Sequence, residues 1–210
     1  MDNKDNNHKK PNKNTETNKK NKKISRSILE FVIFVVLFFL IWTHVNVVVS
    51  NSMYPIMERG DFVLVENAGF EFDLNNVKTG DVVIYDAHWV PELGNYPNQL
   101  IVYENYKYGI YPDNGNIRPV IHRIIGNYTD KNGNIYYIIK GDNNQDRDPE
   151  LVKPEQIKKR ALSWNDNLFV IPKVGYLSIF VKENVLLVIF IIGLLFIYEY
   201  RKSIFKMFNK

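Results

Sequence analysis

The sequence lacks cysteine throughout its 210 residues. This absence excludes disulfide bonds, thiolate metal sites and a thiol nucleophile. Its histidines are few: the four stand at positions 8, 44, 88 and 122, and no two have the spacing of a metal-binding helical turn. A glycine-rich loop that could cradle phosphate is also missing. We therefore expect neither a metal ion nor a cofactor.

The central part of the chain lacks an excess of basic residues. The net charge of +4 resides in the tails, because residues 1–30 carry nine Lys or Arg against four Asp or Glu, whereas residues 50–182 carry fourteen against seventeen. A mildly acidic domain does not offer the cationic face that phosphate contacts require. We therefore expect no nucleic-acid partner. Contact of the Lys/Asn-rich leader with nucleic acid or anionic lipid is a weaker alternative.

Two long apolar runs divide the remaining chain into five parts. Residues 1–27 form a polar, basic tail that is predicted to be disordered. Residues 28–49 are about 22 mostly apolar residues, roughly 33 Å as a helix and enough for a transmembrane span. Residues 183–200 form a second, shorter predicted transmembrane helix, followed by the basic tail 201–210. Basic flanks predict that both termini are cytoplasmic and that residues 50–182 form an extracytoplasmic domain at the cell membrane.

Each run has an alternative interpretation. The first resembles a cleaved signal peptide, but its basic leader is long and no convincing small-residue pair follows it. The second has a strict apolar length of about 14 residues, Val185 to Tyr198, which is short for a span unless residues 176–181 contribute. A buried helix of the soluble domain is the alternative for this run.

The domain between the runs reads as mainly antiparallel β structure. Gly-Asp pairs at residues 60–61 and 80–81 each precede a short run rich in β-branched residues, the pattern of strands entered through turns. Residues 119–128 and 134–140 are two further strand-like runs joined through Asn132-Gly133, a strong hairpin signal. Residues 86–117 are rich in Tyr, Asn and Pro, and packing of their aromatic side chains within the domain is favoured over contact with lipid headgroups.

Ser52 stands where the first apolar run stops, in the stretch Ser50-Asn51-Ser52-Met53-Tyr54-Pro55. Pro55 lacks a backbone donor and biases Tyr54 toward extended geometry, so the preceding helix cannot simply continue. Ser52 is therefore presented on irregular backbone at the expected membrane surface. An ordinary turn serine is the alternative interpretation.

The predicted hairpin brings a histidine toward acidic residues. If Asn132 and Gly133 form a two-residue loop, His122 faces Asn143, and a longer loop shifts its partner to Asp142 or to Gly141. An aspartate beside a histidine sets the ring tautomer and stabilises the imidazolium. A buried core histidine is the alternative for His122. Asp142 alone reads as a turn residue, and Asp148 alone as part of a charged loop before Pro149.

Together these segments resemble the type I signal peptidases, in particular their archaeal and endoplasmic-reticulum branch. The resemblance covers most of residues 47–178 in the family's order. It rests on Ser50-Asn51-Ser52-Met53-Tyr54-Pro55, Gly60-Asp61, Gly80-Asp81-Val82-Val83, Ile121-His122-Arg123-Ile124, Gly141-Asp142-Asn143-Asn144 with Asp148, and Ile171-Pro172-Lys173-Val174-Gly175-Tyr176.

The resemblance implies a membrane-anchored β domain and assigns roles to five residues. Ser52 corresponds to the nucleophile and His122 to the general base, in place of the lysine of bacterial members. Asp142 and Asp148 correspond to the acidic residues, one of which orients the histidine. The resemblance favours Asp148, whereas the hairpin register favours Asp142. Ser50 corresponds to a residue of the oxyanion hole.

The sequence thus predicts a membrane-bound serine endopeptidase that removes signal peptides from exported preproteins. Its expected partners are those preproteins, the lipid bilayer and the protein export machinery. A dedicated processing protease with one substrate is an alternative that differs only in substrate range. A noncatalytic membrane-anchored assembly subunit is the alternative of a different class, but such a subunit has no need for Ser52, His122 and two acidic residues together.

Overall fold

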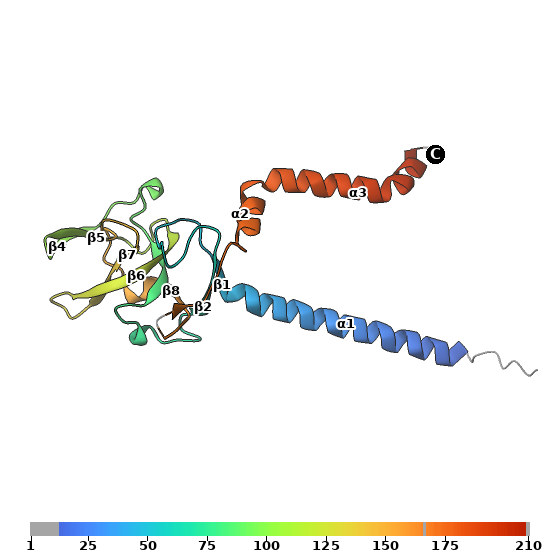
Figure 1. The fold of residues 1–210 in the computed structure, drawn as a ribbon, viewed down its shortest axis with the longest axis horizontal. Helices are drawn as coiled ribbons and strands as arrows, with labels where there is room; N and C mark the ends of the chain where they lie inside the picture. Colours follow the sequence, from blue (N-terminus) through green and yellow to red (C-terminus); the bar gives the residue numbers. More distant parts are fainter. Residues whose placement is uncertain (1–12, 166, 209–210) are drawn as a thin grey trace, which may run out of the picture. The chain divides into compact units, whose positions relative to one another are not determined.

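The computed structural model describes residues 13–165 and 167–208. The chain divides into two compact units, Met1–Thr43 and His44–Lys210. The first unit contains helix α1, and the second contains the β domain followed by two helices (Figure 1).

Helix α1 spans Lys13–Thr43. It therefore includes half of the segment predicted to be disordered, whereas residues 1–12 lie outside the described residues. Extending an existing helix costs far less than nucleating one, so the apolar helix can continue into the polar leader. The predicted helix over residues 28–49 is wrong at its end, because Val45–Val47 form a strand, β1. The apolar part of α1, Ile28–Thr43, is largely exposed. It is too short to pass as a membrane span by itself.

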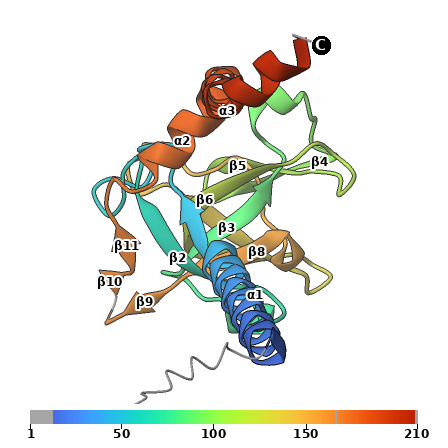
Figure 2. The same ribbon diagram turned by 90° about the vertical axis from the view of Figure 1, so that its right-hand side faces the viewer.

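Seven strands of the described chain form one antiparallel sheet in the order β1-β2-β8-β3-β6-β7, with β11 added beside β2. Strand β11 is seen beside β2 at the edge of the sheet in Figure 2. This arrangement confirms the predicted mainly antiparallel β domain. The strands are β1 Val45–Val47, β2 Phe62–Asn67, β3 Val82–Ala87, β6 Arg118–Thr129, β7 Ile135–Lys140, β8 Ile157–Ala161 and β11 Val170–Ile171.

Smaller elements surround this sheet. Strands β4 and β5 form a hairpin within residues 86–117, where the sequence had given little indication of structure. Strands β9 and β10 form another short pair. The bounds are β4 Gln99–Tyr103, β5 Tyr106–Ile110, β9 Ser163–Trp164 and β10 Asn167–Leu168, with short 3-10 helices η1 Leu74–Asn76, η2 Pro91–Leu93 and η3 Pro154–Gln156.

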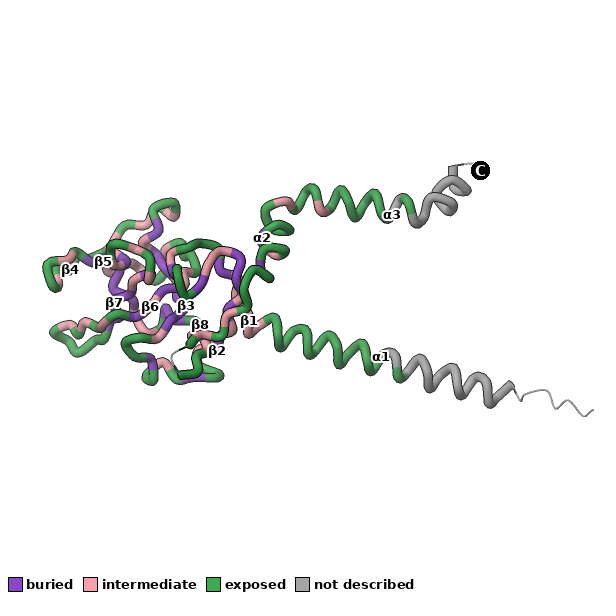
Figure 3. The backbone as a smooth tube through the Cα atoms, in the orientation of Figure 1, coloured by how far each residue is buried: buried purple, intermediate pink, exposed green. Residues whose placement is uncertain are grey.

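The two strands entered through Gly-Asp turns are β2 and β3, as predicted. They are not direct neighbours, because β8 lies between them. Apolar side chains of both strands pack into the buried core, where Val63, Val65, Val82 and Val83 are almost fully buried. Buried residues gather along the central strands (Figure 3). This rigid sheet positions the loops described below.

The predicted hairpin is formed by β6 and β7, but its register differs from that of a two-residue loop. Asp130 accepts hydrogen bonds from the backbone N–H groups of Asn132 and Asn134, which closes a longer turn. A bulge between Ile124 and Gly126 then shifts the pairing by a further residue. Arg123 consequently lies opposite Lys140. The hairpin itself is confirmed, and of the two loop lengths left open by the sequence the longer one is found.

Two helices follow the sheet, α2 (Tyr176–Glu183) and α3 (Val185–Phe208). The predicted helix over residues 183–200 therefore extends through Phe208, and residues 209–210 lie outside the described chain. No single helix among the described residues is long and apolar enough to cross a membrane, but α2 with Val185–Leu195 passes by length and composition as a pair bent by 88°.

Helix α2 is tied to the chain segment that follows Ser52. The Arg59 guanidinium donates to the Glu183 carboxylate at 2.6 Å, and the Gly175 N–H donates to the Gly60 carbonyl at 2.8 Å. A Cβ added to Gly175 would lie 2.9 Å from that same carbonyl oxygen. The helix therefore begins where two backbones approach closely, beside the loop that carries Ser52.

Candidate active site

Ser52 lies on a tight turn that the core holds in place. Met53 and Met57 are almost fully buried beneath it, and the Met57 N–H donates to the Met53 carbonyl at 3.2 Å. The Asn51 side-chain oxygen accepts a hydrogen bond from the Arg59 N–H at 2.8 Å. Anchored on both sides, the turn leaves Ser52 only partly buried. Ser50 and Ser52 are joined through their hydroxyl oxygens, 3.1 Å apart.

The loop that follows β7 and carries Asp142 and Asp148, called the acidic loop below, is hydrogen-bonded directly to this turn. The Asn143 N–H donates to the Ser52 carbonyl at 2.8 Å, and the Asn143 side-chain amide donates to the Asn51 carbonyl at 3.1 Å. Gly141 permits this approach, because a Cβ there would lie 2.7 Å from the Ser52 carbonyl oxygen. The hydrogen bonds therefore fix Ser52 relative to the loop that carries the two candidate aspartates.

His122 is buried on β6, opposite Val83 of β3. Its Nδ1 is 2.7 Å from Oδ2 of Asp148, which is equally buried. The Asp148 N–H donates to the Ile139 carbonyl at 2.8 Å, so the end of strand β7 holds the aspartate in position. In a neutral imidazole that donates from Nδ1–H to this carboxylate, Nε2 is the unprotonated ring nitrogen.

Ser52 and His122 line the same cavity, which has a volume of about 690 Å³. Ser50 and Asn144 contribute to the polar part of its wall, and apolar side chains from β1, β3 and β6 form much of the remainder. Helix α2 contributes Ser178, Ile179 and Lys182. Within the described residues, Ser52 has Ser50 as its side-chain hydrogen-bond partner, and no hydrogen bond joins Ser52 to His122.

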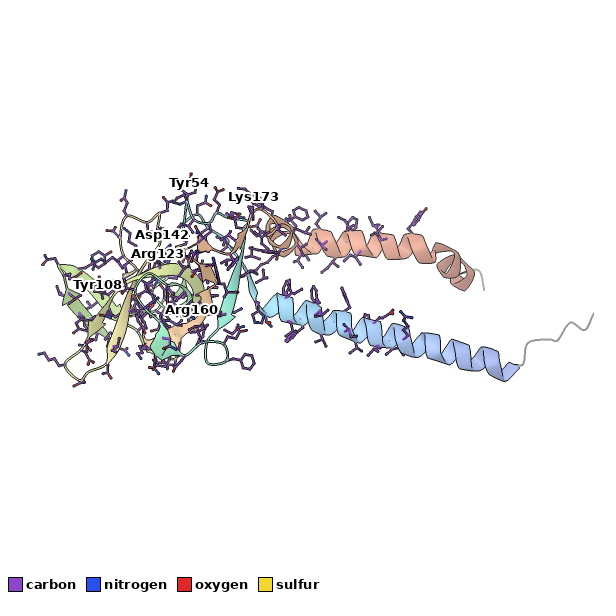
Figure 4. The ribbon with its side chains drawn as sticks, turned by 60° about the horizontal axis from the view of Figure 1, so that its bottom comes forward. Tyr54, Tyr108, Arg123, Asp142, Arg160 and Lys173 are labelled. Carbon is purple, nitrogen blue, oxygen red and sulfur yellow. The ribbon has the colours of Figure 1, made fainter. Side chains whose placement is uncertain are left out.

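Asp142 makes a different contact from the one the hairpin register suggested. Its carboxylate accepts two hydrogen bonds from the Arg123 guanidinium, both at 2.8 Å (Figure 4). Arg123 also donates to the Gly80 carbonyl at 2.8 Å. The hydrogen bonds to Asp142 raise the pKa of Arg123 above its usual value, with burial opposing them. The interpretation of Asp142 as the carboxylate beside His122 is thus wrong, because the register places Arg123 toward Asp142.

Two residues that no sequence motif indicated, Tyr85 and Trp89, are linked to His122 through Asp148. The Tyr85 hydroxyl donates to Asp148 Oδ2 at 2.7 Å, and the Trp89 indole N–H donates to the Tyr85 oxygen at 2.9 Å. The sequence signal was weak, because tyrosine is common in the buried face of a strand. Burial, followed by the nearby Asp148 charge, raises the pKa of Tyr85 well above 10.

A second buried histidine–carboxylate pair lies nearby. His88 Nδ1 is 2.9 Å from Glu150, and the Gln156 amide donates to the same carboxylate oxygen at 2.8 Å. No motif or spacing in the sequence connects these residues. No group of three or more His, Asp or Glu suited to a metal ion occurs among the residues that the structure describes.

Comparison with known proteins finds relatives that differ in identity and in the share of the chain they cover. No protein-family profile matches the chain. An uncharacterised protein of Methanocaldococcus jannaschii is 44% identical over 201 residues, covering 80% of this chain and 98% of the relative. This match shows that the two chains share a family along nearly the whole of the relative.

The partial matches are to signal peptidase complex catalytic subunits named SEC11. The subunit of Eremothecium gossypii is 30% identical over 144 residues, and that of Lachancea thermotolerans is 29% identical over 142 residues. The matches cover 66% of this chain and 65% and 66% of the relatives, just under two thirds of their lengths. The chain therefore belongs to one family with the Methanocaldococcus jannaschii protein and is a distant homologue of the SEC11 signal peptidase catalytic subunits.

Proposed function

We propose that this chain is a serine endopeptidase that cleaves N-terminal signal peptides from preproteins. The distant homology to SEC11 subunits supports signal peptide cleavage in general. One observation supports the serine mechanism. Ser52 and His122 line the same cavity, and Nδ1 of His122 is hydrogen-bonded to the buried Asp148. A hydroxyl is a weak nucleophile unless an adjacent base accepts its proton, and this set of groups provides that base.

In the proposed reaction His122 is the general base and Asp148 orients it. Nε2 of His122 accepts the Ser52 hydroxyl proton while Oγ attacks the scissile carbonyl carbon. The same proton then passes to the leaving amine as the peptide bond breaks, which leaves an acyl-enzyme. Water adds its oxygen to the acyl carbon, His122 accepts the proton from that water and returns it to Oγ, and the carboxylic acid product leaves. The missing Ser52–His122 hydrogen bond is compatible with this role, because such contacts often tighten only when substrate is bound.

The remaining predicted residues receive supporting roles. The Ser50 hydroxyl, 3.1 Å from the nucleophile, is the proposed side-chain donor to the oxyanion. Asp142 acts through Arg123 and the acidic loop rather than through His122. Because that loop is bonded to the Ser52 backbone, Asp142 helps to keep the nucleophile in register with the base.

We also propose that the apolar helices anchor the domain at a membrane, with the cavity on the extracytoplasmic side. The exposed apolar surface of Ile28–Thr43 and of the described part of α3 supports this placement. Helix α2 contributes to the cavity wall and leads directly into α3, so an anchored α3 would bring the cavity close to the lipid surface. A substrate held in the bilayer by its own apolar segment would then present its cleavable bond at the correct depth.

The test is cleavage of preproteins by the purified full-length chain in detergent or vesicles. Ser52→Ala and His122→Ala are each expected to abolish cleavage, because the nucleophile or its base is lost. Ser163→Ala, which alters an exposed serine on β9, is the matched control and should cleave as the wild type does. Retained cleavage in Ser52→Ala would refute the mechanism, whereas absence of cleavage by the purified wild type would favour a noncatalytic assembly subunit. Several unrelated preproteins in the same assay separate a general signal peptidase from a processing protease with one substrate.

A further inference from the structure

We propose that Tyr85, oriented by Trp89, is a positioning residue that fixes the Asp148 carboxylate against His122. This inference rests on the proposed function, since it assigns a role within the same site. The three side chains and the histidine form one continuous line of hydrogen bonds: Trp89 donates to Tyr85, Tyr85 donates to Asp148, and His122 donates to the same Asp148 oxygen.

The sheet register brings Tyr85 and His122 to the same face. His122 of β6 lies opposite Val83 of β3, and Tyr85 lies opposite Val120. Since side chains two residues apart on a strand share a face, the phenol of Tyr85 and the imidazole of His122 are diagonal neighbours. Asp148 enters from the acidic loop and reaches both groups with one oxygen, Oδ2, at 2.7 Å from each.

The direction of the phenol proton is fixed by its two partners. The indole N–H of Trp89 is a donor only, so the Tyr85 oxygen must accept from it. The phenol has one proton of its own, and the remaining partner, Asp148, is an acceptor. The Tyr85 O–H is therefore directed at the carboxylate. Because burial raises the pKa of Tyr85 well above 10, the phenol keeps this proton across the working range of a neutral-pH enzyme.

The backbone of Trp89 is hydrogen-bonded to the second buried histidine–carboxylate pair, His88 and Glu150. The backbone N–H groups of His88 and Trp89 both donate to Oε2 of Glu150, at 2.8 and 3.3 Å. Glu150 is almost completely buried, and Gln156 donates to its other oxygen. The His88–Glu150 pair therefore gives the Trp89 backbone a fixed position. It supplies the anchor for a line of contacts that ends at the imidazole.

Two donors on one oxygen determine the rotation of the Asp148 carboxyl group. With only His122 as a donor, the carboxylate can turn about its side-chain bond and exchange its two oxygens. With Tyr85 as a second donor, the two bonds to Oδ2 are satisfied together in one orientation. Hydrogen bonds to charged groups are among the stronger ones in proteins, so the loss of the phenol donor should be detectable in catalysis.

The decisive variant is Tyr85→Phe in the full-length protein. It removes one oxygen, leaves the ring in the core, and deprives the Trp89 indole of its acceptor. We expect kcat for preprotein cleavage to fall about tenfold with KM within about twofold, because Tyr85 acts on the base and not on the substrate. Trp89→Phe should lower kcat less, because the phenol remains, but should raise KM, because Trp89 lines the cavity. Trp89→Phe also tests the line of contacts if Tyr85→Phe fails to fold.

The matched control is Tyr137→Phe. Tyr137 belongs to the same buried core cluster as Tyr85, but its hydroxyl is near the Leu74 carbonyl at 3.5 Å and does not contact Asp148. This control should retain wild-type kcat and KM. A tenfold loss of kcat in both tyrosine variants would show that the core, and not the contact with Asp148, is responsible, and would overturn the inference.

A spectroscopic measurement tests the inference without cleavage. In protein labelled with ¹⁵N-histidine and carrying Ser52→Ala, the His122 Nδ1–H proton should resonate far downfield because it is bonded to a carboxylate. Adding Tyr85→Phe should move or broaden that resonance, whereas adding Tyr137→Phe should not. The role of Tyr85 would be refuted if Tyr85→Phe left the resonance unchanged in the Ser52→Ala background and also left kcat unchanged in the protein that retains Ser52. Failure of the wild type to cleave any preprotein would instead refute the proposed function, and the resonance comparison would still decide the inference.

Discussion

Replacing Asp148 by Asn is the most informative perturbation of the candidate site. The side chain is almost completely buried, and its Oδ2 accepts from both His122 and Tyr85. An asparagine oxygen can occupy the same position and accept the same two hydrogen bonds. With its oxygen in that position, the variant keeps the shape of the side chain and both hydrogen bonds and removes the negative charge, so the comparison measures the electrostatic contribution of Asp148.

The size of that contribution follows from the contact. When His122 accepts the serine proton it becomes an imidazolium whose Nδ1 is 2.7 Å from Asp148 Oδ2, which we treat as two charge centres about 4 Å apart. At an effective dielectric constant of about 20 such a pair attracts by about 4 kcal/mol. Since about 1.4 kcal/mol corresponds to a factor of ten in rate, we expect kcat to fall by roughly 10²- to 10³-fold. KM should change little, because Asp148 does not line the cavity.

The assay compares preprotein cleavage by the wild type, Asp148→Asn and Asp146→Asn. Asp146 is an exposed residue of the same loop, so its variant controls for the loss of one negative charge. We expect Asp146→Asn to remain within about twofold of the wild type. An Asp148→Asn enzyme that keeps more than a tenth of the wild-type kcat would refute the assignment of Asp148 as the carboxylate that supports the base.

Two further predictions follow from the close approach at Gly141 and from the buried tyrosine. Gly141→Ala should lower cleavage at least tenfold, because its Cβ would lie 2.7 Å from the Ser52 carbonyl oxygen, whereas Gly126→Ala, whose Cβ meets nothing closer than 4.0 Å, should cleave normally; equal activities would contradict the clash. The free energy of unfolding should decrease as the pH rises above about 10, because the pKa of Tyr85 is raised in the folded protein and the unfolded chain loses the phenol proton first. Denaturant titrations from pH 8 to 11 should show a smaller decrease for Tyr85→Phe, and an identical decrease would contradict this origin.

The sequence predicted the strands well where local signals agree. Gly-Asp turns followed by β-branched residues located β2 and β3, and two strand-like runs joined through Asn132-Gly133 located the β6–β7 hairpin. The end of the first helix was not predictable in this way. Val45–Val47 leaves the apolar run to form β1 because it pairs with Phe62–Leu64, and nothing in residues 28–49 indicates that partner.

The choice between the two aspartates shows the same limit at the site. Local turn chemistry at Asp130 and a bulge after Ile124 changed the register, which turned Arg123 toward Asp142. Asp148 reaches His122 because its own backbone is bonded to Ile139, a contact that hairpin arithmetic does not contain. Tyr85 was not selected because its strand sequence is that of an ordinary core strand. Its role depends on what the folded chain places beside its hydroxyl group.

The hydrogen bonds between the serine turn and the acidic loop join two segments that the ribosome synthesises at well-separated times. Asn143 is 92 residues beyond Asn51, and Asp148 comes later still. A ribosome that has released only the first hundred residues has exposed the serine but none of the groups that would activate it. On the proposed mechanism, a nascent chain therefore has no hydrolytic activity. It cannot cleave neighbouring polypeptides at the site of translation until the last strands of the sheet have been synthesised.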